Sequence, residues 1–321
     1  MFTRVGYRFL SLWFGFTILA PLVTSGQLQA QSRQPASRAK PIVAPDANSK
    51  SVALTGTLLR YKLRAGETLR SRVSHFANTR TKIGGLEEDS ESRTVSEKIW
   101  QVKSVDQQGN MTFEFRIDAV DMAQRVGEDE EIKYNSRTDK SVPDAYKKVG
   151  ESLGKPLAVV TISPDGQVVN RDKEMKSPQL GMGELTLPLP KEPLAIGGQW
   201  SVPRECRAKL DDGTYKTIKL RELYILEKVS AGVATISITS QPLTPINDPA
   251  IDSQIVQQLS RGEIKFDIDN GRLLSKHLDW NDVVVGFRGP ETSLKYDARF
   301  IEELLADQNK QTASVTNSKQ K

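Results

Sequence analysis

The sequence contains a single cysteine, Cys206, and only two histidines, His75 and His277. One cysteine cannot form an internal disulfide bond, and Cys206 lies too far downstream to carry the lipid of a bacterial lipoprotein at a leader cleavage site. The sequence has no cluster of histidine and cysteine, so we expect no zinc or copper site and no bound metal. We expect all three residues to be ordinary structural side chains.

Motifs for catalysis and cofactor binding are also not recognised in the sequence. We find no serine in a nucleophile context. The segment Gly181-Met182-Gly183 lacks the third glycine of a dinucleotide-binding loop, because Thr186 occupies that position. Carboxylate pairs that cleave glycosides assemble in space, so the sequence leaves them open. We therefore predict no catalytic residue and no cofactor, and favour a non-enzymatic protein over a hydrolase with an unrecognised site.

The formal net charge of +5 is unevenly distributed along the chain. The first 50 residues carry five net positive charges and residues 306–321 carry two, which leaves −2 for residues 51–305. A slightly acidic folded region argues against nucleic-acid binding. Residues 31–50 are rich in proline, alanine and serine and predict a disordered linker, while the polar residues 306–321 predict a disordered tail.

The beginning of the chain has the features of a cleavable signal peptide, which we place at residues 1–30. Arg4 and Arg8 precede an apolar run over residues 9–23, and Ala30 provides a small residue for cleavage. The apolar run is shorter than the roughly 20 residues of a membrane span, so we expect cleavage and no stable span afterwards. The mature protein is therefore predicted to be exported and to reside in the periplasm, at the cell surface or in the medium.

Residues 51–305 show the alternation of polar and apolar residues that is typical of antiparallel β-strands. Apolar residues occupy every second position over residues 111–117, opposite threonine, glutamate and arginine. Asp-Gly and Asn-Gly dipeptides mark tight turns in two further hairpins, at residues 159–169 and 264–274. Each predicted ribbon has one apolar face, which has to be buried against another layer.

Two segments carry helical signals instead. Residues 143–153 begin with a proline, and residues 249–259 follow Asp248 as an N-cap. Each precedes one of the two hairpins, so the halves 51–175 and 190–305 suggest an internal duplication; the alternative is that β-meanders share a limited turn chemistry. We predict an all-β, antiparallel fold of about a dozen strands with two short helices, built as two curved half-sheets in a half-barrel or clam-like sandwich.

Four strand-and-turn segments carry a resemblance to known sequences: Tyr61-Lys62-Leu63-Arg64-Ala65-Gly66-Glu67, residues 102–109, Ser163-Pro164-Asp165-Gly166-Gln167-Val168 and Pro193-Leu194-Ala195-Ile196-Gly197-Gly198-Gln199-Trp200. Across much of residues 57–285 the chain resembles a family of uncharacterised secreted bacterial proteins, defined as a domain of unknown function. The resemblance implies export and a β-rich fold. It implies no activity and no catalytic residue.

Large apolar side chains on the predicted inward faces are the remaining candidates for a binding site. A ligand between the half-sheets would be lined by Trp100, Phe113, Phe115, Tyr224 and Ile236, and a packed core is the alternative for each of them. We favour an exported, envelope-associated structural or protein-interaction module. The alternatives are a binder or carrier of a lipid or other hydrophobic molecule and, last, a hydrolase. The expected partner is accordingly an envelope protein or a hydrophobic small molecule.

Overall fold

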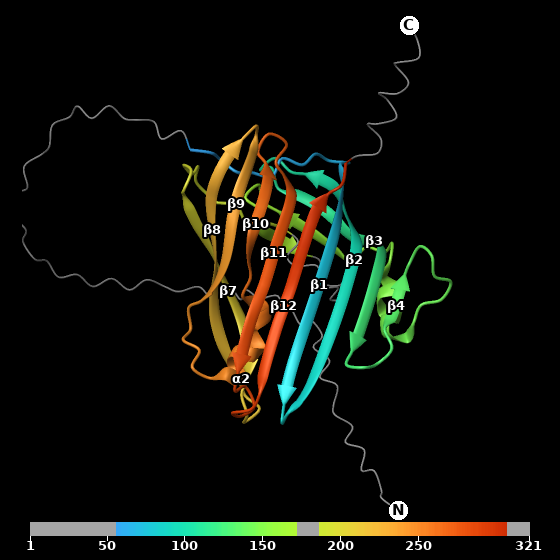
Figure 1. Cartoon of the computed structure of the whole chain (residues 1–321). Helices are drawn as coiled ribbons and strands as arrows, with labels where there is room; N and C mark the ends of the chain where they lie inside the picture. The colour runs from blue at the N-terminus through green and yellow to red at the C-terminus, as the bar shows by residue number, and fades with distance from the viewer. Residues whose placement is uncertain (1–55, 172–185, 307–321) are drawn as a thin grey trace, which may run out of the picture.

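The computed structural model describes residues 56–171 and 186–306 (Figure 1). These two ranges hold nearly all of the β-rich region predicted for residues 51–305. Outside the described residues lie the predicted leader (1–30), the predicted linker (31–50), the segment 172–185 and the predicted tail from residue 307 onward.

Twelve antiparallel strands within the described ranges form one open sheet. They form where polar and apolar residues alternate, because alternation gives a strand one face for the core and one for solvent. β3 (Met111–Val126) buries Met111, Phe113, Phe115 and Ile117 in this way. The other strands are β1 (Thr68–Ile83), β2 (Leu86–Val105), β4 (Ile132–Asn135), β5 (Ala158–Ile162), β6 (Val168–Arg171), β7 (Gln199–Lys209), β8 (Tyr215–Ser230), β9 (Val233–Pro242), β10 (Arg261–Asp267), β11 (Arg272–Val285) and β12 (Ser293–Leu304).

The order of strands across the sheet is β6-β5-β3-β2-β1-β12-β11-β10-β9-β8-β7, and β4 pairs with the second half of β3. Apart from β4, neighbours are successive strands of the chain, except at the centre, where β1 pairs with β12. The predicted all-β, antiparallel class with about a dozen strands is confirmed. The two predicted half-sheets are continuous through the central pair, and the sheet stays open with β6 and β7 at its edges.

The sheet is curved (Figure 1). Its two halves bury their apolar side chains in a shared core. One hydrophobic cluster contains Trp100 and Val102 of β2, Val160 of β5, Leu226 of β8 and Ile264 of β10. We call the face of the sheet that carries these residues the inner face. Its curvature brings strands from opposite ends of the strand order into contact with the same interior, as the clam-like prediction required.

Both predicted helices are present. They are η1 (Asp144–Tyr146) with α1 (Lys147–Ser152), and α2 (Pro249–Ile255) with η2 (Val256–Gln258). Asp248 caps α2 by accepting a hydrogen bond from the backbone nitrogen of Ala250 at 2.9 Å. Ile251 and Ile255 of α2 pack with Ala208, Ile218 and Leu220 of β7 and β8 in a second, smaller cluster. This helix lies at the lower end of the sheet in Figure 1.

The order of elements repeats along the chain. The strands β1, β2 and β3 are followed by a helix and by the hairpin of β5 and β6. The strands β7, β8 and β9 are followed by the other helix and by the hairpin of β10 and β11. Only β4 and β12, among the described strands, have no counterpart. The shared order agrees with the predicted internal duplication.

An N-terminal arm, residues 56–67, runs between the two halves and bonds to both. The backbone nitrogen of Tyr61 donates to Pro164 in the turn between β5 and β6 (2.7 Å), and that of Lys62 donates to Gly271 in the turn between β10 and β11 (3.1 Å). These two turns occupy equivalent places in the repeat. The arm therefore bonds with successive residues to equivalent turns of the two halves.

Replacing Gly271 with alanine is expected to reduce the free energy of unfolding by about 3 kcal/mol. Gly271 has φ of +60°, which costs an L-residue about 1–2 kcal/mol. An added Cβ would also overlap the backbone nitrogen of Lys62 and lie 2.6 Å from the carbonyl oxygen of Arg60, and such overpacking adds about 1–3 kcal/mol. Chemical denaturation measures the change.

The matched control is Gly213→Ala in the turn between β7 and β8. Gly213 has φ of +83°, but a Cβ there would meet nothing within 4 Å. Its cost should be confined to backbone strain, about 1 kcal/mol. Equal losses in the two variants would show that the arm does not pack against the turn at Gly271.

Candidate functional site

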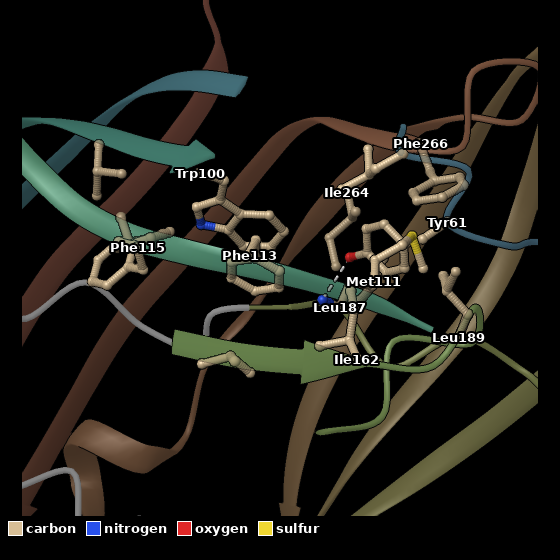
Figure 2. Close-up of a cluster of buried hydrophobic side chains, with 14 of the residues drawn as sticks. Tyr61, Trp100, Met111, Phe113, Phe115, Ile162, Leu187, Leu189, Ile264 and Phe266 are labelled. Carbon is tan, nitrogen blue, oxygen red and sulfur yellow. Dashed lines mark hydrogen bonds between the residues drawn. The ribbon is translucent and has the colours of Figure 1, made fainter. Parts of the chain in front are cut away.

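The structure brings all five residues of the predicted binding site into one core. Trp100 lies on β2, Phe113 and Phe115 on β3, Tyr224 on β8 and Ile236 on β9, and each is between 0% and 7% exposed. The rings of Trp100 and Phe113 stack with centroids 4.3 Å apart, as Figure 2 shows. The alternation of residues thus placed all five side chains on the inner face, as predicted.

Segments of the chain itself occupy the region between the halves. The N-terminal arm contributes Leu59, Tyr61 and Leu63 to the core, and the segment after residue 185 contributes Leu187 and Leu189. The Tyr61 hydroxyl accepts a hydrogen bond from the backbone nitrogen of Leu187 at 2.9 Å, drawn as a dashed line in Figure 2. The edge of one ring meets the face of the other where Tyr61 packs on Phe266, with centroids 5.4 Å apart.

Two surface hollows among the described residues lie away from these five side chains. One borders α1 and is lined by Val142, Asp144, Lys147, Gly150 and Glu151. The other lies where the β1–β2 hairpin meets the β11–β12 turn, and is lined by Lys82, Gly85, Val285, Pro290, Glu291, Thr292 and Ser293. Neither hollow is bordered by Trp100, Phe113, Phe115, Tyr224 or Ile236.

Three charged residues, which the sequence analysis did not single out, are buried on the inner face at the centre of the sheet. Lys98 of β2 forms an ion pair with Glu302 of β12, and the two residues are 2% and 4% exposed. Lys276 of β11 lies directly opposite Glu302 in the strand register and is 8% exposed. Burial lowers the pKa of Lys98, although Glu302 acts in the opposite direction.

A sequence signal for this cluster exists. Lys98 is in phase with the inward Trp100, Lys276 with Leu278, and Glu302 with Phe300. A charge in the apolar phase of a strand indicates a buried polar group, which needs a partner. Three such charges on three different strands therefore predict an ionic cluster, although not which strands lie next to one another.

His75 lies on the inner face of β1, beside this cluster. It is 8% exposed, and its ring approaches the Trp280 ring edge-on with centroids 6.3 Å apart. Burial lowers the pKa of His75 to about 4, so the imidazole is neutral at pH 7. His277, on the outer face of β11, is exposed. Within residues 56–171 and 186–306, no group of three or more His, Cys, Asp or Glu side chains could hold a metal ion.

The buried His75 should make stability depend on pH between 6.5 and 4. The unfolded chain takes up this proton near pH 6.5 and the folded protein only near pH 4, so stability falls as the pH falls through this window. The expected loss is about 3 kcal/mol, measured by chemical denaturation at each pH. His75→Gln should remove this part of the pH dependence, and His277→Gln should leave it in place. If the free energy of unfolding changed with pH by the same amount in the wild type and in His75→Gln, His75 would not be the source of this pH dependence.

No protein-family model matches the chain, and no curated protein matches it, as expected for a resemblance to a family without assigned activity. Among solved structures the chain is similar to one titled "Lipid-protein interactions in lipovitellin", with 11% identity and a TM-score of 0.43. It is also similar to the secretin InvG of the Salmonella SPI-1 type III secretion injectisome in the open gate state, with 10% identity and a TM-score of 0.16.

These likenesses cover 76% and 78% of this chain but only 26% of the lipovitellin chain and 65% of the secretin chain. The chain thus spans about a quarter of the first structure and just under two thirds of the second. Both TM-scores are below 0.5, so neither likeness bears on function. In the part of the chain that the structure describes, no helix is long and apolar enough to cross a membrane.

Ser152 and Cys206 have the chemistry of a nucleophile, but neither lies in the surroundings that would activate it. The pentapeptide Gly150-Glu151-Ser152-Leu153-Gly154 fits the G-x-S-x-G spacing, which the sequence analysis overlooked. Ser152, however, ends α1 and donates to the carbonyl of Val149, whereas a nucleophile elbow lies between a strand and a helix. Cys206 packs in the cluster beneath α2, and burial raises the pKa of its thiol, which disfavours the reactive thiolate.

Proposed function

We propose that this protein is an exported, non-enzymatic module of the bacterial envelope that acts as a structural element or by binding other proteins. The observation that carries the proposal is the filled interior. Leu59, Tyr61 and Leu63 of the N-terminal arm lie among the side chains predicted to line a ligand site, and all of them are buried. A domain whose apolar faces are covered by its own chain needs no ligand to complete its core.

The outer edge of β7 is protected against pairing with another strand. Both backbone groups of Lys209 bond to the side chain of Gln254 in α2, at 2.7 and 2.9 Å, so this residue turns its backbone away from β8. Pro203 has the same orientation, because it lies six positions before Lys209 in a ladder without register shifts, and backbone orientation repeats every second residue. Proline has no N–H to offer a partner strand. We therefore place partner contacts on side-chain surfaces and not on this edge.

Refolding without ligand tests the filled interior. The mature chain is unfolded in guanidinium chloride, extracted to remove bound molecules and refolded in buffer alone. We expect the melting temperature to return to that of the untreated protein, and native mass spectrometry to show only the mass of the chain. A bound molecule at a hundred times its dissociation constant would add about 2.7 kcal/mol. A lower melting temperature that a lipid extract restores would favour the hydrophobic-ligand alternative.

Export is the second part of the proposal, and it is supported by Arg4, Arg8 and the apolar run that follows them. Fusing residues 1–50 to a reporter enzyme that is active only outside the cytoplasm should give activity in whole cells. The matched control deletes the apolar run at residues 9–23 and should abolish that activity. Reporter activity in both fusions, or in neither, would remove the basis for an envelope role.

A further inference from the structure

The buried charges at the centre of the inner face do not balance. In their ionised forms Lys98 and Lys276 carry two positive charges, and Glu302 carries one negative charge. The Lys98 ammonium group bonds to the Glu302 carboxylate. Lys276 faces the same carboxylate across β11 and β12, yet within the described ranges it has no ion pair. An unbalanced buried charge is costly, which gives an anion reason to bind.

Hydrogen-bond donors are also in excess around this cluster. The hydroxyl of Ser96 and the indole nitrogen of Trp100 are buried and have no hydrogen-bond partner in the described part of the chain. Both residues lie on β2 on either side of Lys98, on the same face, and the Lys98 ammonium group is 5.3 Å from the centroid of the Trp100 ring. The cluster thus holds two ammonium groups against the single carboxylate of Glu302, and two further buried donors, a hydroxyl and an indole N–H, lie on β2 next to Lys98. Unsatisfied buried donors of this kind call for an acceptor.

The surroundings of the cluster are apolar. The next inward residues along β12 and β11 are Phe300 and Leu278, which pair with each other in the register. Both belong to the main core cluster, and Trp280 packs against it. Lys276 is the most exposed of the three charged residues, so a ligand would reach the cluster on the side of β11. An alkyl group attached to the anion would find apolar partners there.

We propose that this cluster binds a carboxylate, supplied either by an acyl chain or by a small organic acid. One carboxylate brings the single negative charge and the oxygen acceptors that the cluster lacks, whereas a phosphate dianion would leave a surplus of negative charge. Lys276 makes the ionic contact, and Ser96 and Trp100 donate hydrogen bonds. The site is separate from the proposed structural role, because it concerns an anion at the sheet centre and not the filling of the core.

Three soluble probes distinguish the sources of the carboxylate. Octanoate, acetate and octanol are titrated into the mature chain by isothermal calorimetry. Octanoate carries both a carboxylate and a long alkyl group, acetate has the carboxylate without the long alkyl group, and octanol has the alkyl group without the carboxylate. We expect octanoate to bind at least tenfold more tightly than octanol. Tighter binding of octanoate than of acetate would identify an acyl carboxylate, and equal binding would identify a small acid.

The test variant is Lys276→Met, and the control is Lys295→Met, which removes the same charge from the exposed outer face of the neighbouring strand β12. Lys276→Met should weaken octanoate binding at least tenfold, and Lys295→Met should leave it unchanged. Ser96→Ala, a smaller change, should weaken it severalfold if Lys276→Met does not fold. Three results would overturn the proposal: no binding of either carboxylate, equal binding of octanol and octanoate, or full affinity in the folded Lys276→Met and Ser96→Ala variants.

Discussion

Replacing Phe113 with alanine is expected to lower the free energy of unfolding by about 4 kcal/mol. Phe113 is fully buried on β3, and its ring stacks on Trp100. Truncation removes the transfer free energy of the ring and leaves a cavity in the main core cluster. Denaturation in guanidinium chloride at pH 7 measures the loss, which should appear in the midpoint with little change in slope.

Phe76→Ala is the matched control. Phe76 lies on the outer face of β1 and is 40% exposed, so its truncation should cost well under half as much as that of Phe113. If the two variants lose the same stability, the interior is not tightly packed at Phe113. Binding of a hydrophobic molecule to the interior would then become the better explanation of its apolar lining.

The second large effect is expected at the buried ion pair. Glu302→Gln should cost about 4 kcal/mol at pH 7, because it leaves Lys98 buried without its counter-charge. Burial already lowers the pKa of Lys98, and the loss of Glu302 removes the strongest influence that raises it. Between the lowered pKa of Lys98 in the folded variant and its ordinary value of 10.5, the unfolded chain therefore binds more protons than the folded variant. The loss should accordingly shrink as the pH rises toward that value.

Removing both partners separates the pair from the packing around it. The double variant Lys98→Met, Glu302→Gln should recover a large part of the lost stability, since no unpaired charge remains buried. Glu87→Gln breaks the exposed pair of Lys82 and Glu87 at the tip of the β1–β2 hairpin and should have no measurable effect. If the double variant lost as much free energy of unfolding as the two single variants together, Lys98 and Glu302 would not depend on each other.

The local structure of this protein could be predicted because its causes are local. Alternation along residues 111–117 placed Phe113 and Phe115 on the inner face, and Asp248 before Pro249 predicted the start of α2. Asn270-Gly271 predicted a hairpin turn, because the turn needs a positive φ that glycine adopts freely. In each of these places the signal and the structure it forms lie within a few residues.

Contacts between distant segments could not be predicted in the same way. Apolar and charged residues alternate over residues 59–64, which predicts one buried face. Nothing nearby indicates that Tyr61 bonds to Leu187, because Leu187 is far along the chain. The central pairing of β1 with β12 is equally non-local. The residues of the candidate site also differ in whether their position has a local cause. Trp100 could be assigned to the inner face from its phase, whereas the meeting of Lys98 with Glu302 depends on which strands become neighbours.

The pairing of β1 with β12 has a consequence for how the molecule is made. In the register Ser71 faces Leu304, so the strand that joins the two halves is the last of the described strands in chain order. A partly synthesised chain can form meanders on either side but has no means of connecting them. Contacts between such distant residues form slowly, because a long loop has to be closed first. Assembly of the whole sheet thus waits for completion of its final strand.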